Sequence, residues 1–348
     1  MSSSSGNDPR DSQIWPGESG ASEHGSDAEL PIAASQPLDQ SLDVPVSSDP
    51  IYPQIEAQNA PPSPEPQLFQ SFSAPEVRPQ ERIPNFGHLC ILALLAVIGL
   101  LCTGLLTRAA LAHHLFGISK LQSAVQDIHY ELGTESVLYL FTFIPCLIIF
   151  PMVWQKSFFA GVQWNFGTAL RLRWRLLSAA GSCFLLALLN GFLIPGPSNT
   201  PIDQIFKAPG AAWILFGFGV TFAPFFEEMF FRGFLLPAIC TAIDWSLERK
   251  WHRPPPPLGE NGHPQWSLAA MTIGSVATSI PFALLHAEQT GWAIGPFCLL
   301  LGVSLVLCAV RLSTRSLASS VLVHASYNFM LFSIMLLGTG GFRHLDKM

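Results

Sequence analysis

Charged residues are scarce in this chain. Of its 348 residues only 12% are Asp, Glu, Lys or Arg, whereas 49% are hydrophobic and the mean hydropathy is +0.36. Soluble domains carry about 25% charged residues. The composition therefore excludes an ordinary soluble domain and predicts an integral membrane protein whose first partner is the lipid bilayer.

Several motif classes are missing as well. The seven cysteines lie in apolar stretches and form no CxxC pair, so neither a disulfide framework nor a thiolate zinc site is indicated. No HExxH sequence occurs. No basic run reaches the density that nucleic-acid binding requires, and we expect no nucleic-acid partner.

The first 85 residues differ in composition from the rest. They hold 13 acidic and 3 basic residues and 14 of the 29 prolines. So polar a segment cannot bury enough apolar surface to offset the entropy of ordering, which predicts a disordered acidic tail. It begins without the basic and apolar regions of a cleavable signal peptide, so a cytoplasmic N-terminus is expected. A solvated tail is favoured over a docking arm.

Apolar runs long enough to cross a bilayer follow this tail. The fourth is longer than a bilayer requires and carries Pro224 and Pro237, which predicts a kink or a division into a membrane half and an emergent half. The predicted fold class is all-α, a polytopic transmembrane helical bundle of about seven to eight spans. The expected runs are 89–107, 136–154, 176–194, 211–243, 267–286, 292–310 and 316–337.

Lysine and arginine in short loops predict the orientation of the bundle. Basic residues occur in three loops, at 156–175, 249–253 and 311–315, and counting the spans places all three on one side. That side is predicted to be cytoplasmic, together with the N-terminus. A bacterial chain of this kind would lie in the plasma membrane.

Two adjacent glutamates lie inside the fourth apolar run. A charge near the centre of a bilayer costs about 2.5 to 3.5 kcal/mol, which makes Glu227 and Glu228 candidates for a functional site. Glu228 and Arg232 are four residues apart on a helix and can pair on one face. Glu227 points about 100° away, so it remains free for chemistry or a partner. A purely structural ion pair is the alternative for Glu228 and Arg232.

Two further pairs occur at the same helical spacing. Phe282 and His286 lie near the end of the fifth run, and His324 and Asn328 lie in the seventh. Each pair shares a helix face and can point into the bundle. A lone histidine in an apolar helix is usually a satisfied structural residue, but polar side chains in membrane spans gather around water-filled cavities. The whole set favours such a cavity.

These residue types suit attack by water on an amide. Glu227 can take a proton from water, and His286 can position that water or pass the proton to the leaving amine. His324 and Asn328 can donate hydrogen bonds to the developing oxyanion. Glu227, His286 and His324 could instead hold zinc with water in its fourth position. The missing HExxH favours the metal-free alternative, so the predicted cofactor is none or zinc.

Taken together, the three motifs resemble those of the CPBP family of intramembrane proteases, also called the CAAX prenyl protease and Abi family. The resemblance covers residues 211–337, and any one motif alone would be weak. In chain order the motifs are Glu227-Glu228-xxx-Arg232, Phe282-xxx-His286 and His324-xxx-Asn328.

The resemblance implies a helical-bundle endopeptidase that acts inside the membrane on a peptide or protein substrate. It implies that Glu227 is the water-activating base with His286 as its partner, and that His324 and Asn328 stabilise the oxyanion. Glu228, Arg232 and Phe282 would support the site. Family members were long described as metalloproteases, whereas the prenyl-protease branch favours a glutamate-type mechanism.

Composition, the apolar runs and the resemblance together predict a division of the chain into three parts. Residues 1–85 would be the tail, 86–210 the N-terminal transmembrane helices, and 211–340 the protease-like catalytic core. The competing hypothesis is a non-catalytic membrane scaffold, or an ion or proton pathway that uses the buried Glu and His residues. A pathway would need polar residues through most of the membrane depth, and the first three runs offer few.

One expectation conflicts with a simple count of spans. The count places His286 at the extracytoplasmic end of the fifth run, whereas Glu227 lies in the middle of its segment and His324 about eight residues inside the seventh. A deep cavity, a re-entrant piece or an additional span near the long fourth segment would reconcile these positions.

Overall fold

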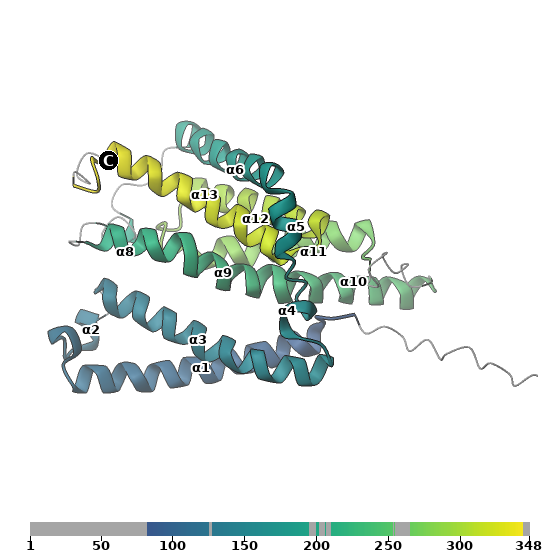
Figure 1. Cartoon of the computed structure of the whole chain (residues 1–348), viewed down its shortest axis with the longest axis horizontal. Coiled ribbons are helices and arrows are strands. Elements are labelled where there is room, and N and C mark those ends of the chain that lie inside the picture. The colour runs from purple at the N-terminus through teal and green to yellow at the C-terminus, as the bar shows by residue number, and fades with distance from the viewer. Residues whose placement is uncertain are drawn as a thin grey trace, which may run out of the picture. The chain divides into compact units, whose positions relative to one another are not determined.

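A computed structural model describes residues 82–124, 127–194, 200–201, 206, 210–252, 254 and 265–343. Of the disordered tail predicted over residues 1–85, residues 1–81 lie outside the described residues, whereas residues 82–85 are described, with Arg82 paired to Glu248. In the described part of the chain every regular element is helical, which confirms the all-α class (Figure 1). The elements are α1 (Phe86–Ala112), η1 (Leu115–Gly117), α2 (Leu121–Ala124), α3 (Ile128–Trp154), α4 (Phe158–Gly161), α5 (Phe166–Arg171), α6 (Arg173–Leu193), α8 (Ala211–Gly217), η2 (Phe218–Phe222), α9 (Ala223–Glu228), η3 (Met229–Leu235), α10 (Leu236–Trp251), α11 (Leu268–Leu285), α12 (Ile294–Thr314) and α13 (Leu317–Gly338).

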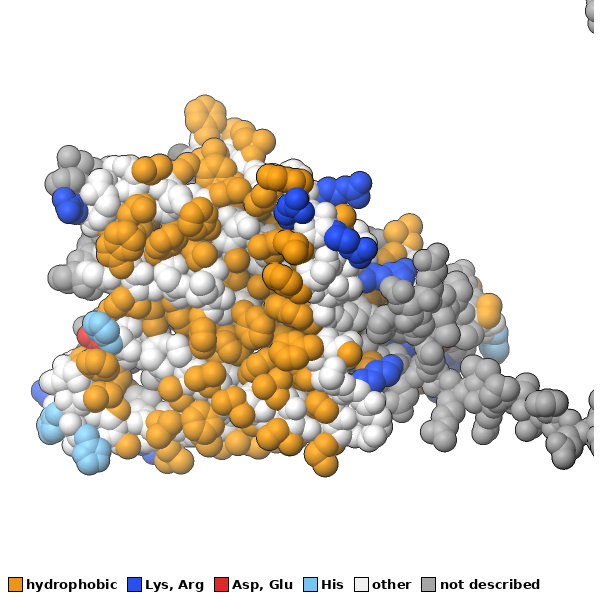
Figure 2. Space-filling view, viewed as in Figure 1, with side chains coloured by type: hydrophobic (Ala, Val, Ile, Leu, Met, Phe, Trp, Pro, Cys, Tyr) orange, Lys and Arg blue, Asp and Glu red, His pale blue; other side chains and the backbone are white. Residues whose placement is uncertain are grey.

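Seven helices among the described residues are long and apolar enough to cross a membrane, which confirms the predicted polytopic bundle. Large apolar side chains remain exposed along α1, α3, α6 and α11, and Figure 2 shows them covering much of one face. Such a surface would aggregate in water, whereas lipid tails solvate it. The exposed apolar surface therefore fits a lipid-facing belt.

The helix ends are fixed by polar side chains. Asn85 accepts a hydrogen bond from the backbone N–H of His88, and the His88 ring accepts one from Asn85 in return. Asp127, Ser267 and Ser316 cap α3, α11 and α13 in the same manner. Each cap satisfies a backbone donor that has no partner within its helix, and this stops the helix at a defined residue.

The fourth span is one continuous helix from Ala211 to Trp251, 41 residues long. At 1.5 Å per residue it extends roughly 60 Å, about twice the hydrocarbon thickness, so part of it emerges from the bilayer core. Pro224 and Pro237 lie in the first turns of α9 and α10, each directly after one of the π-helical stretches η2 and η3. Because proline has no N–H and clashes with the preceding turn, the wider π turns accommodate it without breaking the helix.

Helix α11 packs antiparallel against α10. Asp244 accepts hydrogen bonds from the backbone N and the hydroxyl of Ser267, at 2.9 and 2.5 Å. One to two turns further on, the thiol of Cys240 donates to the carbonyl of Ala270, and Gly274 lies against the same sulfur. A Cβ on Gly274 would come within 2.6 Å of the Cys240 sulfur, so glycine permits this close approach.

Helix α13 also runs antiparallel to the long helix, on another side of it. Phe332 packs on Phe216 with ring centroids 5.6 Å apart, and Asn328 reaches the carbonyl of Gly219. Helix α12 packs between α6, α11 and α13. The motifs predicted from the sequence therefore lie on the long helix itself and on two helices, α11 and α13, that pack against it.

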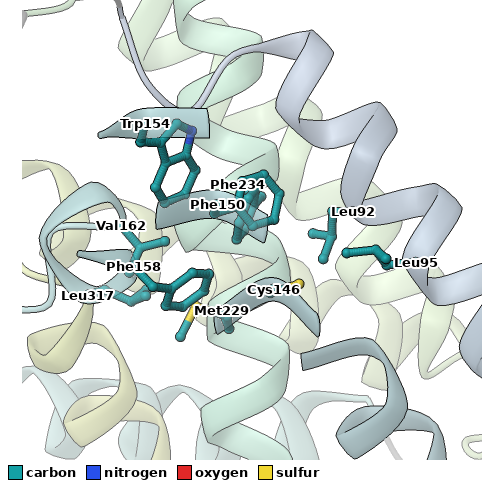
Figure 3. Packing of buried hydrophobic residues seen from close by; sticks show 10 residues of the cluster. All are labelled: Leu92, Leu95, Cys146, Phe150, Trp154, Phe158, Val162, Met229, Phe234 and Leu317. Atoms are coloured by element: carbon teal, nitrogen blue, oxygen red, sulfur yellow. The ribbon is translucent and has the colours of Figure 1, made fainter. Parts of the chain in front are cut away.

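The hairpin of α1 and α3 joins the long helix through an apolar cluster, shown in Figure 3. Phe150 is at the centre of the cluster, 4.6 Å from the Trp154 ring and 4.9 Å from the Phe234 ring. Burying a large aromatic side chain contributes about 1.5 to 3 kcal/mol. The buried members are Leu92, Leu95, Cys146, Phe150, Trp154, Phe158, Val162, Met229, Phe234 and Leu317.

Several basic segments meet at one end of the bundle. The N–H of Leu317 donates to the carbonyl of Gln163, and the Ser316 hydroxyl donates to the carbonyl of Asn165, so the α12–α13 turn contacts the segment after α4. Figure 2 shows Lys and Arg side chains next to the end of the apolar surface. The assignment of this end to the cytoplasm stays a prediction. Exposed basic residues here are Lys156, Arg171, Arg173, Arg175 and Arg315.

Candidate active site

Glu227 lies between the two predicted histidines. One carboxyl oxygen is 3.8 Å from Nε2 of His286, and the other is 3.9 Å from Nε2 of His324. Both separations exceed a hydrogen bond. The Glu227 side chain is 11% exposed, and its Oε2 atom is buried without a hydrogen-bond partner among the described residues. A buried carboxyl oxygen left without a partner is costly, so its position requires a functional reason.

His286 is held by its own helix. Its Nδ1 lies 2.9 Å from the carbonyl oxygen of Phe282, one turn earlier. A carbonyl only accepts, so Nδ1 carries the hydrogen in this contact. In the neutral ring Nε2 is then an acceptor, and it is the atom that faces Glu227. Nε2 of His286 and the Glu227 carboxyl oxygen are therefore two hydrogen-bond acceptors 3.8 Å apart. A molecule that donates one hydrogen bond to each of them fits between them.

Glu228 is a fully buried acceptor for three side chains. Its Oε1 lies 2.7 Å from Nη1 of Arg232 and 3.0 Å from Nδ1 of His324, and Oε2 accepts the hydroxyl of Ser320. The predicted ion pair with Arg232 is present, because i and i+4 positions share a helix face. Its contact with His324 was not expected, and it fixes Nδ1 as the donor nitrogen of that ring.

Arg232 connects the long helix to α12. Its Nη2 donates to the hydroxyl of Ser304 at 2.6 Å and to the Ser304 carbonyl at 3.1 Å. The guanidinium lies 4.5 Å above the ring of Phe282, a cation–π contact in a fully buried setting. The Phe282 ring also packs against His286 and His324, with centroids 4.9 and 5.9 Å apart. Phe282 therefore holds the arginine and both imidazoles in place.

Asn328 makes a contact that its predicted role does not include. Its side-chain N–H donates to the carbonyl of Gly219 at 2.7 Å, in the π-helical stretch η2. An amide carries two N–H donors, so a second remains for another acceptor. Asn328 thus ties α13 to the long helix one turn from His324. Its role toward an oxyanion stays a prediction.

A cavity of about 690 Å³ lies next to Glu227. Side chains from α1, α3, η3 and α11 line it, and they are mostly apolar. Glu227 is the one carboxyl among the lining residues, and the Tyr139 ring stacks on Phe226 with centroids 4.7 Å apart. Clefts of this volume hold small ligands or peptide side chains. The cavity brings an apolar ligand to the carboxyl group.

The described residues do not form a metal site. A zinc ion needs donor atoms about 2.0 to 2.2 Å from one point, and no three His, Cys, Asp or Glu side chains in the described part of the chain are so placed. Glu227, His286 and His324, the predicted zinc ligands, face one another without closing around such a point. Metal analysis of the purified protein is the direct test of zinc.

The long helix resolves the conflict between the positions of His286 and Glu227. Since α11 starts beside Asp244 and runs back along the helix, its last turn reaches Phe231 and then Glu227. His286 thus ends its own helix while Glu227 lies in the middle of a much longer one. No re-entrant piece is needed among the described residues.

Three polar side chains near the site were missed by sequence reasoning. Ser320 had a signal, because it precedes His324 by four residues and so shares its face. Glu135 accepts the hydroxyl of Tyr139 at 2.5 Å and lies inside α3, although the predicted apolar run began one residue after it. No sequence pattern pointed to Ser304, since a serine in an apolar helix is common.

Comparison with known families gives a match to part of the chain. Residues 209–330 match the family described as type II CAAX prenyl endopeptidase Rce1-like. The matched range includes every motif residue from Glu227 to Asn328, which confirms the resemblance seen in the sequence. No curated protein and no solved structure matches the chain. The match over residues 209–330 supports the assignment of this integral, multi-pass membrane protein to the CPBP/CAAX protease family.

Proposed function

We propose that the chain is an intramembrane endopeptidase in which Glu227 activates the attacking water. The observation that carries the proposal is the placement of its carboxyl group. Glu227 is largely buried, has an oxygen without a hydrogen-bond partner, and faces the Nε2 atoms of two histidines on separate helices. The family match supports protease activity, and this geometry supports the assignment of the base.

In the proposed reaction a water molecule binds between Glu227 and His286. It donates one hydrogen to the carboxylate and the other to Nε2 of the neutral imidazole, which accounts for two acceptors that face each other. As the water oxygen attacks the carbonyl carbon, Glu227 takes its proton and the carbonyl electrons move to oxygen. The tetrahedral intermediate then breaks its C–N bond, and the proton passes to the leaving amine.

His324 is proposed to stabilise the oxyanion from Nε2. Because its Nδ1–H donates to Glu228, Nε2 can donate only if the ring carries both protons. The second amide hydrogen of Asn328 is the other proposed donor. In this arrangement Glu228 positions the His324 ring and also pairs with Arg232.

The cavity next to Glu227 is proposed to bind the apolar part of the substrate. The matched family is named for prenyl endopeptidases, and a mostly apolar cavity of about 690 Å³ suits a lipid-modified peptide. Burial of a prenyl chain contributes about 25 cal/mol per Å² of apolar surface. An ion or proton pathway would instead need polar groups along its walls.

The test is cleavage of a CaaX peptide by the purified full chain in detergent. A farnesylated peptide and its unmodified twin are compared with the wild type, Glu227→Gln and Glu288→Gln, where Glu288 is an exposed acid near the site. We expect cleavage of the farnesylated peptide by the wild type and Glu288→Gln, and none by Glu227→Gln at an unchanged thermal midpoint. Near wild-type turnover by Glu227→Gln would show that the assigned base is wrong.

Addition of a strong chelator tests whether the reaction needs a metal, independently of which peptide is cleaved. Under the proposed mechanism a strong chelator leaves cleavage unchanged. Loss of activity that Zn²⁺ restores, together with stoichiometric zinc that disappears in His324→Ala, would replace the oxyanion role of His324 by metal binding. Equal cleavage of the farnesylated and unmodified peptides would show that the protein is an endopeptidase that does not recognise the prenyl group.

A further inference from the structure

We propose that a small pocket at the basic end of the bundle binds a phosphate group. The pocket has a volume of about 80 Å³ and lies at the junction of α11, the end of α12 and the segment after α4. Its polar lining consists of two arginines and two glutamines, with an indole beside them. These residues are Gln163, Gln265, Trp266, Arg311 and Arg315.

Arg311 is the first reason for this assignment. It is 1% exposed, and all three of its described hydrogen bonds go to neutral oxygens. Nε donates to the carbonyl of Arg232, Nη1 to the side-chain oxygen of Gln163, and Nη2 to the carbonyl of Val162. A guanidinium has five N–H donors, so one remains on each terminal nitrogen.

The second reason is the balance of charge around this pocket. Neither Arg311 nor Arg315 has an ion-pair partner among the described residues. The buried acids Glu228 and Asp244 bind other groups. Glu228 accepts hydrogen bonds from Arg232 and His324, and Asp244 accepts hydrogen bonds from Ser267. A buried charge without a counter-charge is strongly unfavourable. An anion bound in this pocket would supply the missing counter-charge.

The third reason is the arrangement of donors around the pocket. Because the side-chain oxygen of Gln163 accepts from Arg311, its amide N–H₂ remains a donor. Gln163 and Arg315 both adopt left-handed backbone conformations, with φ of 58° and 49°. Arg315 is exposed at the end of α12 and brings a second guanidinium to the pocket. Forked arginine donors match the oxygens of phosphate.

The shared chemistry is a phosphate group, which can belong to an anionic phospholipid or to a free phosphate. The neighbouring basic residues lie next to the end of the apolar surface, where lipid headgroups would contact a membrane protein, and basic pockets between helices recognise such headgroups. This site is separate from Glu227 and requires no catalytic activity. Binding is therefore measured on its own.

The experiment uses the full chain in a maltoside detergent and measures equilibrium binding by native mass spectrometry and by the thermal midpoint. The ligands are inorganic phosphate, short-chain phosphatidylglycerol and diacylglycerol with the same chains. The variant is Arg315→Gln, because Arg315 is exposed and can change without unfolding the protein. The control is Arg249→Gln, another exposed arginine, which contacts Trp245 and does not line the pocket.

We expect one saturable site for phosphatidylglycerol in the wild type and in Arg249→Gln, and roughly tenfold weaker binding in Arg315→Gln. If inorganic phosphate binds with the same dependence on Arg315, the phosphate group alone suffices. If only phosphatidylglycerol binds, the source is a lipid headgroup. Binding of diacylglycerol as tight as phosphatidylglycerol, equal effects of the two arginine changes, or no saturable site would overturn the proposal.

Discussion

Glu228 contacts three hydrogen-bond donors at the site. Its carboxylate accepts from Arg232, His324 and Ser320, and it is fully buried. Ser320 and His324 approach from successive turns of α13 and Arg232 from the long helix, so the carboxylate fixes α13 relative to the long helix. Arg232 in turn contacts α12 through Ser304. Its removal should affect folding and chemistry together.

For Glu228→Gln we therefore expect a loss of about 3 to 5 kcal/mol in the free energy of unfolding, because Arg232 stays buried without its counter-charge. Turnover should also fall, since His324 loses the acceptor that orients it. Thermal unfolding and peptide cleavage are the measurements. Ser320→Ala is the control, because it removes a neutral donor and leaves Arg232 paired. An equal loss of stability in both variants would contradict the argument.

Asn328→Ala tests the proposed oxyanion donor. Removal of one such donor typically lowers turnover about a hundred- to a thousand-fold, with little change in KM. The variant also leaves the Gly219 carbonyl without its donor, which costs about 1 to 3 kcal/mol of stability.

Ser316→Ala is the control for Asn328→Ala, because it deletes another hydrogen bond from α13 to a backbone carbonyl, at Asn165, together with the cap bond from Ser319, and Ser316 does not line the cavity. We expect similar thermal midpoints for the two variants and a fall in turnover only for Asn328→Ala. Parallel losses of turnover would assign Asn328 a structural role.

The sequence predicted contacts within one helix better than contacts between helices. The spacing of Glu228 and Arg232 specified an ion pair, since i and i+4 positions meet on any helix. The contacts of Glu228 with His324, and of Arg232 with Ser304, depend on how separate helices pack. Residue spacing contains no information about that packing.

The interface between α10 and α11 sets the distance between Glu227 and His286. It depends on Gly274, where a Cβ would meet the Cys240 sulfur at 2.6 Å. For Gly274→Ala we expect a loss of about 1 to 3 kcal/mol, because the helices must separate or the thiol must rotate away from Ala270. Cleavage should fall as His286 moves.

The control for this change is Gly217→Ala, at the end of α8, where an added Cβ meets nothing within 4 Å. It should be neutral or stabilising by up to about 1 kcal/mol, since alanine is the better helix former. Thermal midpoints and cleavage rates of the two variants give the comparison. A stable, fully active Gly274→Ala protein would show that the interface tolerates displacement.

The number of helices was predictable, whereas the shape of the fourth was not. Seven apolar runs were expected and seven spanning helices are found among the described residues, because length and hydropathy alone define a span. The prolines Pro224 and Pro237 predicted a kink or a division. The π-helical stretches before the two prolines keep the helix continuous. Whether a proline segment bends or forms a π turn depends on contacts from other helices, such as that of Asn328 with Gly219, and the sequence around the proline does not contain this information.

The described chain begins at Arg82, which forms a 2.6 Å ion pair with Glu248, and Asn85 caps α1. Composition predicts that the preceding residues are dispensable. We expect a chain that starts at residue 81 to keep full activity and its thermal midpoint. A chain that starts at residue 87 should lose about 1 kcal/mol through the missing cap.

Cleavage assays and thermal unfolding of these two shortened chains are the measurements. The chain that starts at residue 81 tests whether the preceding tail is needed. The chain that starts at residue 87 tests the contribution of the segment 82–85, which contacts the folded helices. A loss of activity in the longer of the two would assign a role to the acidic tail.

The antiparallel alignment of α10 and α11 also limits where the length of this chain can change. One residue inserted between Glu228 and Asp244 would rotate the carboxylates by about 100° relative to the Asp244–Ser267 contact, and His286 would face an apolar side chain. The same insertion between Trp251 and Gln265 changes no contact that the described residues make at the site. Related chains should therefore vary in length in that connection while the two helical segments keep a fixed count, and random insertion libraries should recover active clones there and not within the helices.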